Sequence, residues 1–160
     1  MALLRSERSD AIKEPFNLPR LMTSARRFRC CLAGGTFDRI HAGHRLLLNA
    51  ASKDAEAVEI HITSDSMAEA KSPFVQSFED RMDELHNWAG KITGCKISIH
   101  QLNDPHGPAR HHTTADAIVA TPETIGMCNV INEERLGNEL QALHIIEVMH
   151  LDGVEGGIIS

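Results

Sequence analysis

The sequence of 160 residues contains no apolar run that approaches the roughly 18 residues of a membrane span, and we expect no segment that crosses a membrane. Its four cysteines form no C-x-x-C pair, which favours a reducing, cytoplasmic setting. The formal net charge is −6, and the lysines and arginines are scattered without a basic stripe that would neutralise a nucleic-acid backbone. The composition thus argues against membranes and nucleic acids as partners and leaves anions to be bound at a local site.

The chain is long enough for one domain with a sizeable core, since about two thirds of the unfolded surface is buried at this size. Residues 1–27 mix charges of both signs with Pro15 and Pro19 and show little hydrophobic periodicity. Three acidic residues in this stretch argue against an organelle transit peptide. We therefore expect a disordered extension over 1–27 and a folded domain over 28–160.

From Phe28 onward, short apolar runs alternate with longer amphipathic stretches, a pattern typical of β-α-β units and a mostly parallel sheet. Strands are predicted over 28–33, 58–63, 96–102, 117–120 and 144–149. Helices are predicted from Ala42 onward, around 78–85 and over 130–136, and a polar connection follows the second strand. The fold class is therefore α/β, a doubly wound, mostly parallel five-stranded sheet with helices on both faces.

The run Gly34-Gly35-Thr36-Phe37-Asp38-Arg39-Ile40-His41-Ala42-Gly43-His44 lies between the first predicted strand and the first predicted helix. Two glycines let the backbone bend sharply and approach a ligand, and free amides at the start of the helix attract anions. The two histidines add imidazole donors on the same side. Ligands of open parallel sheets lie beyond the carboxyl ends of the strands, so the loops at Gly34, Ser64, Asp104 and Thr121 should gather at one rim.

This run fills every position of a T-F-D-x-x-H-x-G-H pattern and resembles the signature of the nucleotidyltransferase superfamily. The positions are taken by Thr36, Phe37, Asp38, His41, Gly43 and His44. Members of this superfamily join a nucleoside monophosphate to a phosphorylated partner and release pyrophosphate. The resemblance implies a Rossmann-like nucleotidyltransferase fold and a substrate site that includes these residues and Gly35.

Nucleotidyl transfer demands neutralisation of charge on crowded phosphate oxygens more than a protein nucleophile. We expect His44 to bond the developing charge, Thr36 to place its hydroxyl between the reacting phosphates, and His41 to hold another triphosphate oxygen. Asp38 is expected to cap the turn or orient an imidazole. Lys71 stands where superfamily members place a lysine that neutralises the attacking phosphate, so His44, Thr36 and Lys71 are the predicted catalytic residues.

Further segments resemble one branch of the superfamily, the archaeal-type phosphopantetheine adenylyltransferases. Residues 104–109 read D-P-H-G-P-A, close to the branch element D-P-Y-G-P. Residues 121–124 and 131–135 resemble S-x-E-T followed by I-N-x-x-R, a region that borders the nucleotide in the family. Asn132 and Arg135 are three apart on one helix face, so both are expected to point at the same ligand. The resemblance adds Asp104, Thr121, Glu123, Asn132 and Arg135 to the substrate-binding residues.

The branch implies transfer of AMP from ATP to 4′-phosphopantetheine, giving dephospho-coenzyme A and pyrophosphate, with Mg²⁺ accompanying ATP. Open alternatives are another phosphorylated acceptor (riboflavin phosphate, nicotinamide mononucleotide or choline phosphate) and a non-catalytic nucleotide-binding protein. Family members continue the last residues as I-S-S-T-x-x-R, whereas here the match reaches only Ser160. We expect Ser160 to contact substrate and the rest of that phosphate-binding motif to be lacking; oligomeric state is left open.

Histidine is abundant, with 10 residues, and His106, His111 and His112 cluster in one predicted loop. A zinc site is conceivable from this cluster. No cysteine lies at ligand spacing beside it, however, so a solvated histidine-rich loop is favoured and no metal site is predicted.

Overall fold

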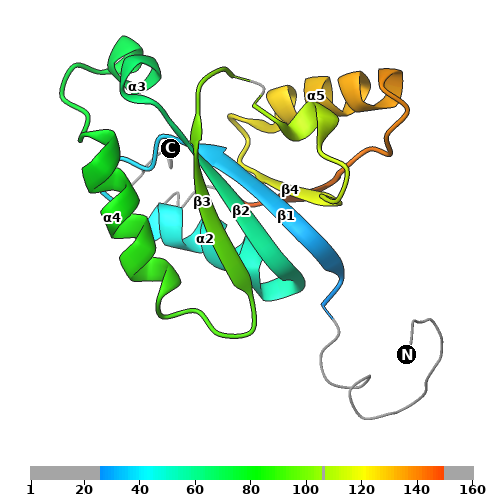
Figure 1. The fold of residues 1–160 in the computed structure, drawn as a ribbon, viewed down its shortest axis with the longest axis horizontal. Coiled ribbons are helices and arrows are strands. Elements are labelled where there is room, and N and C mark those ends of the chain that lie inside the picture. Colours follow the sequence, from blue (N-terminus) through cyan, green and yellow to red (C-terminus); the bar gives the residue numbers. More distant parts are fainter. Residues whose placement is uncertain (1–25, 106, 150–160) are drawn as a thin grey trace.

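The fold is seen in a computed structural model that describes residues 26–105 and 107–149. A single parallel sheet contains β1 (Phe28–Gly35), β2 (Ala55–Thr63), β3 (Lys96–Leu102), β4 (Ala117–Ala120) and β5 (His144–Glu147). The strand order is β3-β2-β1-β4-β5 (Figure 1). The chain therefore builds outward from β1 through β2 to β3 and then returns to the other side of β1. This reversal beside β1 is the point at which doubly wound sheets bind their ligands.

Helices cover both faces of the sheet, as predicted (Figure 1). On one face, α2 (Ala42–Asp54) and α4 (Phe78–Ala89) pack on inward-facing residues of β1 and β2; on the other, α5 (Ile125–Gly137) packs on β1 and β4. Adjacent residues of β1 serve opposite faces, because side chains alternate along a strand. Cys31 and Ala33 belong to the first core, and Cys30 and Leu32 to the second.

The predicted strands 96–102 and 117–120 are confirmed without change, and β1 extends two residues further than expected. Pairing between β1 and β2 continues to Gly35 opposite Ile62, so the glycine pair ends the strand and the turn begins after it. The stretch after β2, predicted as a polar connection, instead contains helix α3 (Asp65–Lys71). Its N-cap Ser64 accepts a hydrogen bond from the backbone N–H of Met67, which stabilises this short helix.

The helices otherwise follow the apolar periodicity. In α2, Leu47, Leu48 and Ala51 are buried, whereas Leu46 is exposed. In α4, the N-cap Ser77 accepts from the backbone of Asp80, as expected for this position. Helix α5 begins five residues before the predicted 130, at Ile125. Within the described part of the chain, no helix has the length and apolar character that a membrane crossing requires.

Candidate active site

Two adjoining cavities open at the carboxyl ends of the strands, on either side of the glycine turn. The polar cavity has a volume of about 440 Å³ and is lined by Thr36, Phe37, Asp38, His41, His44 and Thr121 among others. The apolar cavity, of about 320 Å³, is lined largely by aliphatic residues that include Leu102, Pro105, Ile118 and Ile131. Both cavities share the lining residues Gly34, Gly35, Lys71, Val119, Glu123 and Thr124. Two ligands placed in them would meet at this common wall.

The turn after β1 adopts a conformation that the surrounding packing must hold. Phe37 and Arg39 have positive φ angles of 55° and 47°, which side chains other than glycine rarely adopt. The Phe37 ring is 2 % exposed and packs over Gly35, where an added Cβ would lie 3.3 Å from the ring. Asp38 accepts from the Gln76 backbone N–H at 2.8 Å and so ties the turn to the loop before α4. A side chain at position 35 would therefore force the aromatic ring at 37 to shift by a few tenths of an ångström.

The two histidines of the turn cap the start of α2. The Nδ1 atom of His41 accepts from the Gly43 N–H at 3.1 Å, and the His41 side chain also accepts from the backbone N–H of His44. The Nδ1 atom of His44 accepts from the His41 N–H at 3.3 Å. The rings stack with their centroids 3.9 Å apart. An Nδ1 atom that accepts carries no proton, so in each ring the proton sits on Nε2. The amides of Gly43 and His44 are therefore already bonded to the His41 side chain, and both histidine rings line the polar cavity.

Lys71, Glu123 and Thr121 come from the other strand ends. Lys71 is the last residue of α3, not part of a loop as predicted, and it lines both cavities. Glu123 also lines both cavities. Thr121 lies immediately after β4, and its backbone N–H donates to the Thr124 hydroxyl at 2.9 Å. The structure therefore brings together residues that are far apart in the sequence, as the rim argument predicted.

Asp104, Asn132 and Arg135 line neither cavity. Asp104 accepts from the Gly107 N–H at 2.9 Å and forms a tight turn. The Asn132 amide bonds both backbone groups of Leu143, at 2.7 and 3.0 Å. The expectation that Asn132 and Arg135 point at one ligand is corrected, because both contact backbone instead. Ser160 lies outside the described residues, as do the proposed extension through residue 25 and the expected gap in the C-terminal motif.

Arg135 is the more deeply buried of the pair, at 3 % exposure. Its guanidinium donates to the carbonyls of Gln141, Ala109 and His112, each at 2.8 Å. Burial lowers the pKa of this guanidinium. The side chain holds the 3-10 turn Ala109–His111 against α5 and thereby shapes the far wall of the apolar cavity.

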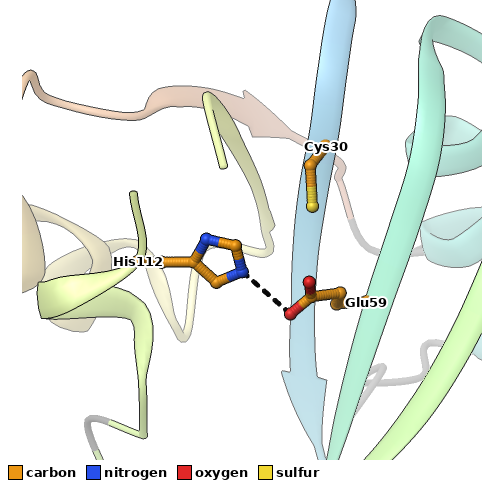
Figure 2. A group of neighbouring side chains, drawn as sticks. All are labelled: Cys30, Glu59 and His112. Carbon is orange, nitrogen blue, oxygen red and sulfur yellow. Dashed lines mark hydrogen bonds and ion pairs between the residues drawn. The ribbon is translucent and has the colours of Figure 1, made fainter. Parts of the chain in front are cut away.

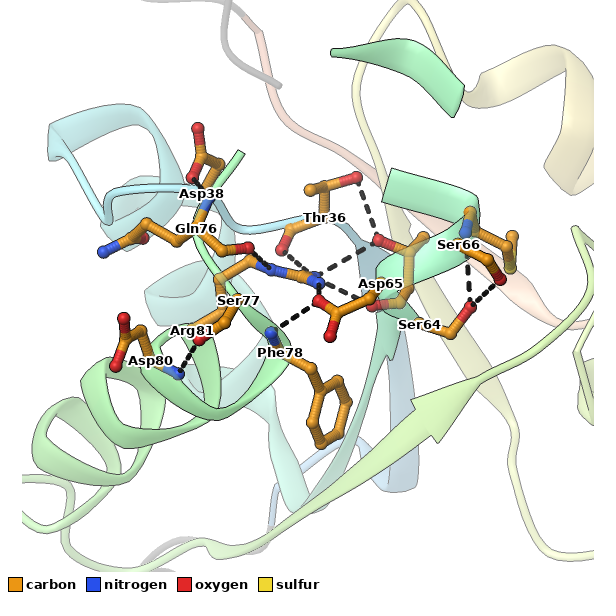
Figure 3. A network of polar contacts seen from close by, with 12 residues as sticks. Thr36, Asp38, Ser64, Asp65, Ser66, Gln76, Ser77, Phe78, Asp80 and Arg81 are labelled. Atoms are coloured by element: carbon orange, nitrogen blue, oxygen red, sulfur yellow. Dashed lines mark hydrogen bonds and ion pairs between the residues drawn. The ribbon is translucent and has the colours of Figure 1, made fainter. Parts of the chain in front are cut away.

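Arg81 is a buried residue that the sequence interpretation missed. Its side chain is wholly buried at the base of α4, and its guanidinium points toward Thr36 and Asp65 (Figure 3). It donates to the carbonyls of Gln76, Thr36 and Thr63 at 2.8–3.1 Å. A signal was present: position 81 lies on the same helix face as the apolar Phe78 and Leu85, where a charged residue is unusual.

A separate cluster joins Cys30, Glu59 and His112, whose potential metal-ligating atoms all lie within 4.8 Å of one another (Figure 2). The Nε2 atom of His112 lies 2.9 Å from Glu59, and its Nδ1 atom accepts from the Ala115 N–H at 3.0 Å. His112 therefore carries its proton on Nε2 and donates it to Glu59, so no lone pair faces a metal ion. The expectation of a solvated histidine-rich loop is wrong for His112. Its hydrogen bond to Glu59 connects the loop after the 3-10 turn to β2.

Electrostatics agree with this interpretation of the cluster. Burial and the neighbouring Glu59 raise the pKa of the Cys30 thiol to about 12, which keeps it protonated. Burial acts to raise the pKa of Glu59, but the hydrogen bonds and charges of His112 and His61 outweigh it, and the pKa is lowered. The described polar contacts of Glu59 in this cluster are those with His112 at 2.9 Å and with the neighbouring His61 at 3.4 Å.

A parallel sheet with a histidine-lined polar cavity at its switch point defines an α/β protein suited to a phosphorylated ligand. Residues 32–150 match the cytidylyltransferase-like family, and the chain belongs to this family. It is 36 % identical over 141 residues to a phosphopantetheine adenylyltransferase of Methanopyrus kandleri, covering 87 % of this chain and 90 % of that protein. It is 33 % identical over 135 residues to one of Methanothermobacter thermautotrophicus, covering 84 % and 82 %.

Solved structures give the same fold. An Archaeoglobus fulgidus protein of unknown function aligns with a TM-score of 0.66 at 27 % identity, covering 82 % of this chain and 94 % of that one. A lipopolysaccharide core biosynthesis protein of Thermoplasma volcanium aligns with a TM-score of 0.59 at 16 % identity, covering 78 % and 98 %, which supports the fold alone.

Proposed function

We propose that this protein is an adenylyltransferase that transfers AMP from ATP to 4′-phosphopantetheine, giving dephospho-coenzyme A and pyrophosphate. The observation that carries the proposal is the pair of cavities joined at Gly35 and Lys71, one polar and histidine-lined, the other aliphatic. The names of the Methanopyrus and Methanothermobacter relatives support the same reaction.

The polar cavity suits the triphosphate. In the reaction, a phosphate oxygen of the acceptor attacks the α-phosphorus of ATP, the bond from that phosphorus to the β-phosphate bridging oxygen breaks, and pyrophosphate leaves with the electron pair. His41 and His44, which line this cavity, supply imidazole N–H donors to the crowded oxygens. Lys71, on the common wall, supplies positive charge where the two phosphates approach each other.

The apolar cavity suits a flexible aliphatic arm better than the alternative acceptors do. Its described lining contains no phenylalanine or tryptophan to stack on a flavin or to form an aromatic cage around choline. Aliphatic side chains surround it, and Thr124 provides a polar group for the amides of a pantetheine arm.

Mg²⁺ is expected to arrive with ATP, bound mainly by phosphate oxygens and water. The carboxylates that line the polar cavity are those of Asp38 and Glu123. Both oxygens of Asp38 are engaged, one with the Gln76 backbone and one with Arg39 at 2.7 Å. Glu123 is therefore the lining carboxylate best placed to meet a water of the hydrated ion.

The test is pyrophosphate release from ATP with a panel of acceptors: 4′-phosphopantetheine, riboflavin phosphate, nicotinamide mononucleotide and choline phosphate, with product masses determined. We expect release with 4′-phosphopantetheine and formation of dephospho-coenzyme A. His44→Ala should lower kcat by about 10²–10³-fold, the cost of losing one donor to the transition state. His111→Ala is the matched control, because His111 is exposed and lines neither cavity.

Faster turnover with another acceptor would refute the assignment of substrate. Binding of ATP with no product from any acceptor would support the non-catalytic alternative instead.

A further inference from the structure

We propose that Arg81 and Thr63 are positioning residues that fix the Thr36 hydroxyl as a hydrogen-bond donor toward a phosphate of the bound substrate. This inference rests on the proposed function, since it concerns the same polar cavity. It assigns a purpose to a fully buried arginine and to a buried threonine that neither the sequence motif nor the lining of the polar cavity includes.

The proposed arrangement is a chain of hydrogen bonds from Arg81 through Thr63 to Thr36, named the relay below. It begins at the Arg81 guanidinium, which has five N–H donors and no acceptor. Its Nη1 atom lies 2.8 Å from the Thr63 carbonyl, 3.1 Å from the Thr36 carbonyl and 3.3 Å from the Thr63 hydroxyl oxygen. Because Nη1 carries two protons, the Thr63 hydroxyl oxygen accepts in a longer hydrogen bond that it shares with a carbonyl. The same guanidinium fixes the backbone of both threonines, so the distance between their side chains is set by one rigid, planar group.

The second step is the hydrogen bond between the two threonines. Because the oxygen of Thr63 accepts from Arg81, its proton is free to point elsewhere, and it donates to the Thr36 hydroxyl oxygen at 3.1 Å. Thr63 is 5 % exposed, and this is the described acceptor for its proton. Water has little access to disturb the orientation.

The third step leaves Thr36 with a defined polarity. Its oxygen accepts from Thr63, and its own proton meets no acceptor among residues 26–105 and 107–149. Thr36 lines the polar cavity together with His41 and His44. The outward proton matches a phosphate oxygen, which can only accept. With the relay reversed, Thr36 would instead present a lone pair to an anion, which is repulsive.

A double-mutant cycle tests the relay. Thr63→Val removes the hydroxyl with little change of shape, and Thr63→Ser restores it. Both changes are made with Thr36 intact and in Thr36→Val, and thermal melting verifies that each variant is folded. We expect Thr63→Val to lower kcat/KM about tenfold, the effect of one hydrogen bond of about 1.4 kcal/mol. Thr63→Ser should recover most of that loss, and Thr63→Val should cost less than twofold when position 36 is already valine.

The same cycle is run on equilibrium binding of ATP and of inorganic tripolyphosphate by calorimetry, without any acceptor. A loss of affinity on Thr63→Val that disappears in the Thr36→Val background supports the relay even if no acceptor is ever turned over. This binding readout separates failure of the relay from failure of the proposed reaction. It also separates the relay from any direct effect of Thr63 on the acceptor, since Thr63 lines the apolar cavity.

Equal losses from Thr63→Val in both backgrounds, or no rescue by Thr63→Ser, would overturn the inference. Such additivity would mean that Thr63 acts through packing and not through the Thr36 hydroxyl.

Discussion

Replacing Arg135 separates two roles that the sequence and the structure assign to it. The sequence motif predicts a ligand contact, whereas the structure buries the guanidinium against three carbonyls at 2.8 Å. Arg135→Met keeps much of the aliphatic stem and removes every donor. The carbonyls of Gln141, Ala109 and His112 then lose their bonded partner in a site that is 3 % exposed.

The magnitude follows from those bonds. A hydrogen bond from a charged group contributes about 1.5–3 kcal/mol, and losses beyond about 5 kcal/mol are exceptional for single substitutions. We expect Arg135→Met to lower the free energy of unfolding by about 3–5 kcal/mol, which at this chain length lowers Tm by about 10–15 °C. Arg135→Lys keeps the charge but reaches fewer carbonyls, so about half of that loss is expected.

The assay is urea denaturation of each variant together with ATP binding measured below the transition. Arg29→Met is the matched control, because Arg29 is exposed on β1, and it should change stability by less than about 0.5 kcal/mol. ATP affinity of the folded Arg135 variants should stay within about threefold of wild type. A variant that melts with wild type yet loses ATP affinity would refute the structural role and restore the role predicted from the motif.

Three other predictions concern the glycine turn and the pKa values of Glu59 and His61. Gly35→Ala should cost about 1–3 kcal/mol, because its Cβ would lie 3.3 Å from the Phe37 ring, whereas Gly34→Ala should be milder at 3.8 Å from the nearest atom. The lowered pKa of Glu59 stabilises the fold above the unfolded value of 4.5, so Glu59→Gln should flatten the loss of stability below that pH. Burial and the charge of His100 lower the pKa of His61, so stability should also fall as pH drops below 6.5, and less so in His61→Gln.

Denaturation across pH 3–8 measures the last two effects, and urea denaturation at neutral pH measures the first. Equal costs at positions 34 and 35 would contradict the contact with the aromatic ring. A wild-type protein that gains stability on acidification through either range would contradict the sign of the corresponding pKa shift.

The architecture was largely predictable because it depends on repeating patterns. Apolar runs alternate with amphipathic stretches along the chain. This pattern predicted the parallel sheet, its five strands and the helices on both faces, all of which the structure contains. Helix α3 escaped prediction because its stability comes from the Ser64 cap and tertiary packing, with a single buried residue, Ala68, and no visible stripe.

The site was predictable in position but less so in detail. The loops converge because strand ends of a parallel sheet share an edge, whichever side chains they carry. The direction of a polar side chain depends on rotamers and on partners distant in sequence, which spacing does not encode. Arg135 bonds Ala109, 26 residues away, and His112 bonds Glu59, 53 residues away. The occupation of the helix amides by His41 likewise follows from a side-chain conformation that the motif does not specify.

The position of β1 in the middle of the sheet has a consequence for how ligand and folding are coupled. Its pairing with β2 joins residues 27 apart, as in Phe28 with Ala55, whereas its pairing with β4 joins residues 86 apart, as in Cys31 with Ala117. Closing the longer loop costs more entropy, so we expect β4 and α5 to assemble after β1, β2 and β3. A ligand bound between β1–β3 and the segment made of β4 and α5 holds that segment in place. On ligand binding, the protection of backbone amides from hydrogen exchange should therefore rise most in β4 and α5.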